Sequence, residues 1–209
     1  MSNTKGTPRS ASVHDPQHLV IPPGLSIVGE GEWAAAKHGG KGRRGWKKLH
    51  LGVDGDGVIV AQSLTDGKAH DAIEGLELLA SVKQDVATLT GDGAYDSVAI
   101  YKASNARGAR VVVPPSRVAE KPRRRLPKSA ERDRVIERVR DVGRRRWKKE
   151  AGYHRQGRVE NTYFRLKSIV GGRLRARHAT AQATEALIAC NVLNRMFELG
   201  RPRSVAIPR

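Results

Sequence analysis

The sequence is short of acidic residues and of cysteine. Its 21 Asp and Glu stand against 39 Lys and Arg, which gives a formal net charge of +18 at pH 7. The cationic excess is spread along the chain and predicts a polyanionic partner such as nucleic acid. The single cysteine, Cys190, excludes an intrachain disulfide and a cysteine-based zinc site, and its place in an apolar helical pattern predicts a core position.

Long apolar runs are absent as well. No stretch resembles a signal peptide or reaches the about 18 apolar residues of a membrane-spanning helix, so we expect a soluble, cytoplasmic protein without membrane contact. The length suits one domain. We expect a disordered leader at 1–17, one domain over 18–202 with a basic linker at 116–128, and a tail at 203–209.

Short apolar runs alternate with helical patterns along this domain. Strands are expected at 18–21, 25–28, 46–53, 58–61, 87–90 and 109–113, and helices at 71–82, 97–107, 130–146, 158–170 and 180–199. Asp71 is the expected N-cap of the first helix, in which Ile73 should face the core. In the last helix, Leu187 and Met196 are expected on the inner face with Cys190.

Two segments carry obvious charge. Residues 37–48 are rich in Gly, Lys and Arg, and we expect Lys41, Arg43 and Arg44 to contact phosphate from a basic loop. Asp54-Gly55-Asp56-Gly57 separates two apolar runs and predicts a β-hairpin turn. Its acids could bind a metal ion, but turn chemistry alone explains them, and we favour that interpretation.

Asp92 lies immediately beyond a short apolar strand, between Gly91 and Gly93. Glycines let the backbone turn sharply and let a bulky ligand approach, and loops at the carboxyl ends of strands are where α/β sheets place their chemistry. The alternative is a helix N-terminus, for which Asp96 before Ser97 would serve, and this leaves Asp92 less explained.

Glu160 is the single acid in a basic stretch near the C-terminal third of the chain. The apolar spacing predicts a helix from about residue 158 that ends at Gly171-Gly172, so Glu160 and Lys167 should share a face. Such a face could hold a divalent cation and grip a phosphate backbone, with Arg155 and Arg158 as further cations. The alternative is an exposed helix whose charged side chains only face solvent and bind no ligand.

The order of these elements resembles the ribonuclease H-like domain of bacterial insertion-sequence transposases of the DDE type, in the group of insertion-sequence families four and five. The resemblance is carried by four stretches: 29–33, 46–54 with its hairpin, 91–96 and 153–167. It implies an α/β fold with a mixed sheet flanked by helices, and two Mg²⁺ ions held by Asp, Asp and Glu. It also implies DNA partners, namely the terminal inverted repeats and the target, and a homo-oligomer on DNA.

The resemblance implies residue roles. Asp92 matches the family's second Asp and Glu160 its Glu, both as catalytic residues and metal ligands. Tyr153, Glu160 and Lys167 match three positions of the family's Tyr-Arg-Glu-Lys signature, so Tyr153 and Lys167 are expected to contact DNA.

Three departures from the family are visible. Ile21 stands where the family has its first Asp, in Ile21-Pro22-Pro23 instead of Asp-Ser-Thr, and Gln156 stands at the signature Arg. The family's usual N-terminal DNA-binding region is also missing before the domain, which predicts an N-terminally truncated copy. We therefore expect a transposase with impaired cleavage and strand transfer. The alternatives are a non-catalytic DNA-binding remnant and a basic RNA- or ribosome-binding protein, the last of which leaves Asp92 and Glu160 unexplained.

Overall fold

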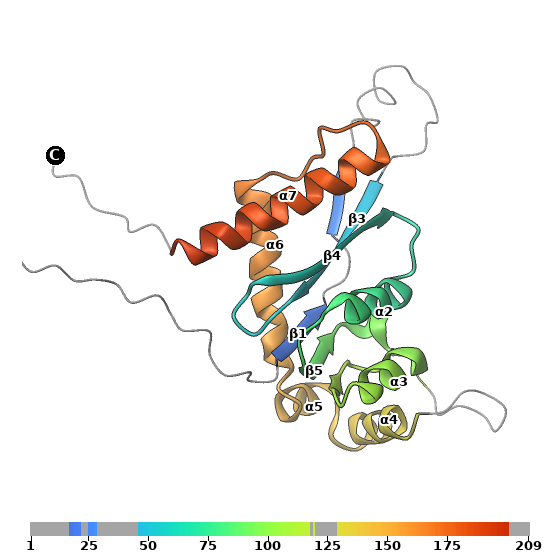
Figure 1. The fold of residues 1–209 in the computed structure, drawn as a ribbon. Coiled ribbons are helices and arrows are strands. Elements are labelled where there is room, and N and C mark those ends of the chain that lie inside the picture. Colours follow the sequence, from blue (N-terminus) through green and yellow to red (C-terminus); the bar gives the residue numbers. More distant parts are fainter. Residues whose placement is uncertain (1–16, 22–24, 29–45, 118, 120–128, 201–209) are drawn as a thin grey trace, which may run out of the picture.

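The computed structural model describes residues 17–21, 25–28, 46–117, 119 and 129–200, and these form an α/β fold around one mixed sheet (Figure 1). This confirms the expected fold class. The strands are β1 (Gln17–Ile21), β2 (Leu25–Val28), β3 (Trp46–Val53), β4 (Ile59–Asp66), β5 (Val86–Gly91) and β6 (Arg110–Val112). Lys41, Arg43, Arg44 and most of the predicted basic segments 37–48 and 116–128 lie outside the described residues.

The sheet has an antiparallel half and a parallel half. β3 pairs antiparallel with β4 along one edge, and with both β2 and β1 along its other edge. β1 then pairs in parallel with β5, and β5 with β6. The carboxyl ends of β1 and β5 are therefore neighbours at the centre of the sheet, where Ile21 lies opposite Gly91.

Helices cover both faces of the sheet (Figure 1). The longer helices are α2 (Asp71–Ser81), α3 (Val98–Ala106), α4 (Ala130–Val142), α5 (Arg144–Glu150), α6 (Gly157–Ile169) and α7 (Ala179–Glu198), with the short 3-10 helices η1 (Gly93–Tyr95) and η2 (Tyr153–Gln156). The predicted helix 130–146 is in fact two helices, because Gly143 takes a positive φ of 79° between α4 and α5. No helix in the described ranges is long and apolar enough to cross a membrane.

Two apolar clusters follow from this layering. Leu19 and Ile21 point to the α2 and α3 side, whereas Val20 points to the α6 and α7 side, as the alternation of a strand requires. Cys190 is buried in the second cluster, as predicted.

The phase of α2 differs from the prediction. Ile73 is 58% exposed, and Gly75 faces inward, where an added Cβ would come within 2.8 Å of the Tyr95 ring. The close approach of α2 to Tyr95 thus requires a glycine. In α7, Leu187 and Met196 are also exposed, contrary to the prediction, whereas Cys190 faces the core as predicted.

Candidate active site

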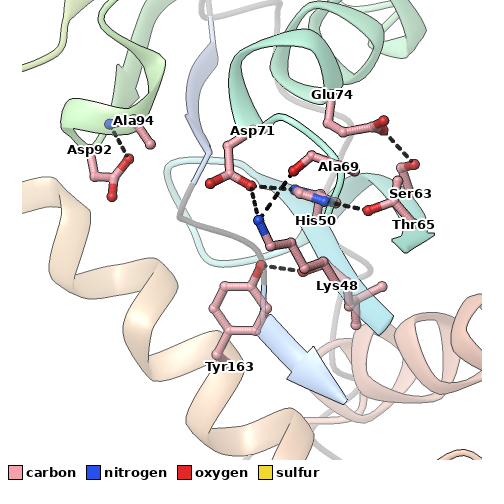
Figure 2. Close-up of polar contacts among 11 residues, drawn as sticks. Lys48, His50, Ser63, Thr65, Ala69, Asp71, Glu74, Asp92, Ala94 and Tyr163 are labelled. Atoms are coloured by element: carbon pink, nitrogen blue, oxygen red, sulfur yellow. Dashed lines mark hydrogen bonds and ion pairs between the residues drawn. The ribbon is translucent and has the colours of Figure 1, made fainter. Parts of the chain in front are cut away.

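Asp92 begins the loop at the carboxyl end of β5. Its Oδ1 accepts a hydrogen bond from the backbone N–H of Ala94 at 3.0 Å, so Asp92 caps η1 (Figure 2). Burial raises the pKa of this carboxyl group, and the nearby charge of Asp71 raises it further, against the opposing effect of the Ala94 N–H. Asp92 is thus a half-buried carboxylate with a second carboxylate, that of Asp71, within its electrostatic reach, and a bound cation would stabilise its ionised form.

Tyr153 lies within the electrostatic reach of both Asp92 and Glu160. Glu160 lies in the first turn of α6 and is exposed, and Tyr153 opens η2 just before it. Burial raises the pKa of the Tyr153 hydroxyl, and the charges of both Asp92 and Glu160 raise it further. The charges of both acids therefore affect the ionisation of one half-buried tyrosine hydroxyl. The ammonium of Lys148 lies over the ring of Tyr153, 4.5 Å from its centroid.

Ile21 occupies the third expected position. It is fully buried and belongs to the same apolar cluster as Tyr95. No group of Ile21 can coordinate an ion.

These residues do not fit a two-ion magnesium site. Two carboxylates, Asp92 and Glu160, come within the electrostatic reach of one tyrosine, but an apolar side chain fills the third place. In the part of the chain that the structure describes, no three His, Cys, Asp or Glu side chains gather closely enough to hold a metal ion. Hard divalent cations need several oxygen ligands, so the site as it stands lacks part of its donor set.

Asp71 is the residue near this site that sequence reasoning placed in the wrong role. It is the first residue of α2 instead of its N-cap, which is His70, and its carboxylate accepts a hydrogen bond from the ammonium of Lys48 at 3.1 Å (Figure 2). The buried His50 points its Nδ1 at Asp71 from 4.0 Å and binds Thr65 through Nε2. Burial is the main reason that the pKa of His50 is lowered. The sequence offers no signal for this cluster, because Lys48 and His50 are more than 20 residues from Asp71.

Two other acids have structural roles. Oδ1 of Asp54 accepts hydrogen bonds from the backbone N–H groups of Asp56, Gly57 and Val58, each at 2.9 Å, which confirms the turn interpretation. Asp96, 1% exposed, is held by a bidentate contact with Arg132. The residue that caps α3 is Ser97, whose Oγ accepts from the N–H of Ile100.

The predicted DNA-binding residues are only partly placed. Lys167 is exposed on α6, two helical turns beyond Glu160, so the two share a face of this continuous helix. The backbones of Arg155 and Arg158 lie in η2 and α6, but their side chains are outside the described part of the structure. Gln156 is buried, and its Oε1 has no hydrogen-bond partner among the described groups.

A comparison with protein families identifies the family of this chain. The sequence matches the family described as "Transposase DDE domain" over residues 6–195, which is most of the 209-residue chain. The match includes every strand of the sheet and both elements that carry Asp92 and Glu160. The chain therefore belongs to the transposase DDE domain family.

Proposed function

We propose that this chain is a DNA transposase domain of an insertion sequence whose phosphodiester cleavage and strand transfer are impaired by Ile21. The observation that carries the proposal is that Asp92, at the carboxyl end of β5, and Glu160, on α6, both act electrostatically on Tyr153, while the buried apolar Ile21 stands where a third carboxylate is expected. Family membership supports DNA as the partner, and the net charge of +18 favours any polyanion.

Each described residue has a definite task in this proposal. Asp92 and Glu160 would be the remaining acids that face the scissile phosphodiester from β5 and α6. Lys167 would contact the DNA backbone on the same face of α6 as Glu160. Tyr153, with Lys148 over its ring, would position the DNA near these acids. The family generally uses divalent ions, which supply nucleophile activation and leaving-group stabilisation when bound.

Cleavage of DNA carrying the element ends tests the proposal. We expect the wild-type chain with Mg²⁺ or Mn²⁺ to cleave no more than a Glu160→Gln control. An Ile21→Asp variant should cleave measurably, and the double variant Ile21→Asp with Glu160→Gln should lose that gain. Cleavage by the wild-type chain that Glu160→Gln abolishes would show that two carboxylates suffice and would overturn the claim of impairment.

A second candidate function is a non-catalytic DNA-binding remnant that occupies element ends. The burial of Ile21 in an apolar cluster favours it, because this position offers no oxygen ligand. The remnant would bind DNA as well as an intact transposase and would inhibit it in a mixture. Failure of Ile21→Asp to gain cleavage, together with retained DNA binding, would support this second function over the first.

A further inference from the structure

Phe164 on α6 presents its aromatic ring to solvent and is 70% exposed. The other aromatic side chains that the structure describes are buried or half-buried, namely Tyr95, Tyr101, Trp147, Tyr153, Tyr163 and Phe197. A phenyl ring offers a large apolar surface and no hydrogen-bonding group, so hydration does not favour its exposure. The position of Phe164 therefore calls for a ligand that can cover the ring.

The inner face of α6 fixes the rotation of the helix and hence the direction of Phe164. Tyr163 is 8% exposed, and its hydroxyl donates a hydrogen bond to the backbone carbonyl of Leu49 in β3 at 2.9 Å. The hydroxyl of Thr162 donates to the backbone carbonyl of Gly57 in the β3–β4 turn at 3.3 Å. Two side chains of α6 are thus bonded to the sheet and its hairpin, and they hold the next residue, Phe164, on the solvent side.

Phe164 stands between Glu160 and Lys167 along one face of α6. It follows Glu160 by four residues and precedes Lys167 by three, and side chains at these spacings are neighbours on a helix. Both of these charged side chains are exposed. The ring therefore lies between the acid proposed to face the scissile phosphodiester and the lysine proposed to contact the DNA backbone. A DNA strand that meets both of them passes over the ring.

The charge that follows Glu160 is complementary to a nucleic acid. Residues 161–184 contain five Lys and Arg and no Asp or Glu. Lys167, Arg173 and Arg175 are exposed members of this cationic set. An exposed aromatic ring in a cationic segment matches a partner that carries both phosphates and flat apolar faces. A nucleic-acid strand has both, because its phosphates meet the cations while its bases stack on the ring.

We propose that the ring of Phe164 stacks on an unpaired base of the bound DNA, beside the phosphodiester that faces Glu160. In a paired duplex the faces of each base are covered by its neighbours, so a phenyl ring reaches a base face only where the strand is unstacked. Stacking of this kind contributes about 5- to 100-fold in affinity and tolerates any base. The inference rests on the proposed function, since it takes DNA as the partner and α6 as its contact.

Fluorescence anisotropy with two DNA probes tests the stacking contact. One probe is a fully paired duplex, and the other is the same duplex with one additional thymidine that has no partner. The wild type should bind the second probe more tightly. Phe164→Ala should lose this preference because its affinity for the second probe falls by about 5- to 100-fold, whereas Phe164→Trp should keep it. The slope of log affinity against log salt should stay unchanged in Phe164→Ala, because no phosphate contact is removed.

Ile169→Ala is the matched control. Ile169 is 46% exposed on the same helix, but it lies five residues beyond Phe164 and hence about 140° around the helix axis. Its loss should leave the affinities for both probes unchanged. If the chain binds neither probe, the proposed function fails together with this inference. If it binds both probes, the stacking contact alone is overturned by any of three results: equal affinity of the wild type for the two probes, equal behaviour of Phe164→Ala and Ile169→Ala, or loss of the preference in Phe164→Trp.

Discussion

Ile21 lies directly opposite Gly91 across the parallel pair of β1 and β5, and Asp92 is the next residue along the chain. Position 21 is therefore one strand away from the carboxylate that begins the candidate site. The side chain of Ile21 belongs to the apolar cluster that also holds Tyr95, so position 21 offers no oxygen ligand. In our proposal Asp92 and Glu160 are the remaining acids of the site, and the third is lost through a change of a single side chain at the centre of the sheet.

The stability of the protein should depend on pH through Asp92, because the pKa of this carboxyl group is raised in the folded state. Its pKa is raised by burial first and by Asp71 second, so the folded state binds this proton more readily than the unfolded state. Ionisation of Asp92 consequently lowers stability as the pH rises through the folded pKa. Asp92→Asn keeps an oxygen for the Ala94 N–H and removes the charge. It should melt at a higher temperature than the wild type at pH 7, and the difference should shrink near about pH 4.

The control for that measurement is Asp56→Asn, because Asp56 is an exposed turn residue. It should not change the melting temperature at either pH. A lower melting temperature for Asp92→Asn at pH 7 would contradict the assignment of Asp92 to a buried, like-charged setting.

The ion pair of Asp96 with Arg132 should be a main support of the domain. Asp96 is 1% exposed, and it also accepts a hydrogen bond from the N–H of Ser116, so it joins α4 to two loops. Arg132→Ala leaves a buried carboxylate without its cation, and we expect a loss of about 3–5 kcal/mol in the free energy of unfolding. Urea denaturation measures this loss.

Arg138→Ala is the matched control for Arg132→Ala. Arg138 also contacts a carboxylate, that of Glu150, but its side chain is 50% exposed. Its loss should therefore lower the free energy of unfolding far less than the loss of Arg132 does. Similar costs for the two arginine variants would show that the Asp96 contact is not a buried anchor.

Lys167 should contribute to DNA affinity. Lys167→Ala is expected to weaken duplex binding and to reduce by about 1 the slope of log affinity against log salt, because one phosphate contact is lost. Fluorescence anisotropy over a series of salt concentrations measures both values, with Lys102→Ala on α3 as the control for an exposed lysine elsewhere. An unchanged slope for Lys167→Ala, or tighter binding of RNA than of DNA, would favour the RNA-binding alternative.

The codons of residues 21–23 offer a genetic prediction. If the Asp-Ser-Thr of related transposases is written GAT-TCC-ACC and read one base later, it becomes ATT-CCA-CCN, which encodes Ile-Pro-Pro. The chain has this tripeptide, followed by the Gly24-Leu25 that the family also has. We therefore expect ATT-CCA-CCN at codons 21–23, as left by a one-base deletion and a compensating insertion. Sequencing the DNA tests this, and any other codon for Ile21 or Pro22 would contradict it.

The sequence predicts the elements well and their contacts less well. Turn chemistry identified the β3–β4 hairpin, and a strand followed by Gly91-Asp92-Gly93 identified the loop at the sheet centre. Both signals depend only on residues that are adjacent in the sequence, so the sequence alone is enough to predict these two elements. The contact of Asp96 with Arg132 joins residues that are far apart in the sequence, so no local sequence pattern predicts it.

The faces of the helices were predicted less well for a related reason. Apolar periodicity assumes that large side chains face the core, but α2 turns Gly75 inward to approach Tyr95 and leaves Ile73 outside. In α7, apolar residues lie on two faces, so periodicity alone could not say which of them packs on the sheet. The role of Asp71 was missed because an Asp before a helical pattern also suits a cap.

Isothermal titration with Mn²⁺ tests the central claim most directly, namely that Asp92 and Glu160 form a metal site from which only the ligand at position 21 is missing. The wild type, Ile21→Asp and Ile21→Asn would be compared after circular dichroism has shown that each is folded. We expect binding by Ile21→Asp alone, with a rise of its melting temperature in Mn²⁺, because the Asn variant matches the shape of Asp without its charge. Equal Mn²⁺ binding by the wild type and Ile21→Asp would contradict the account.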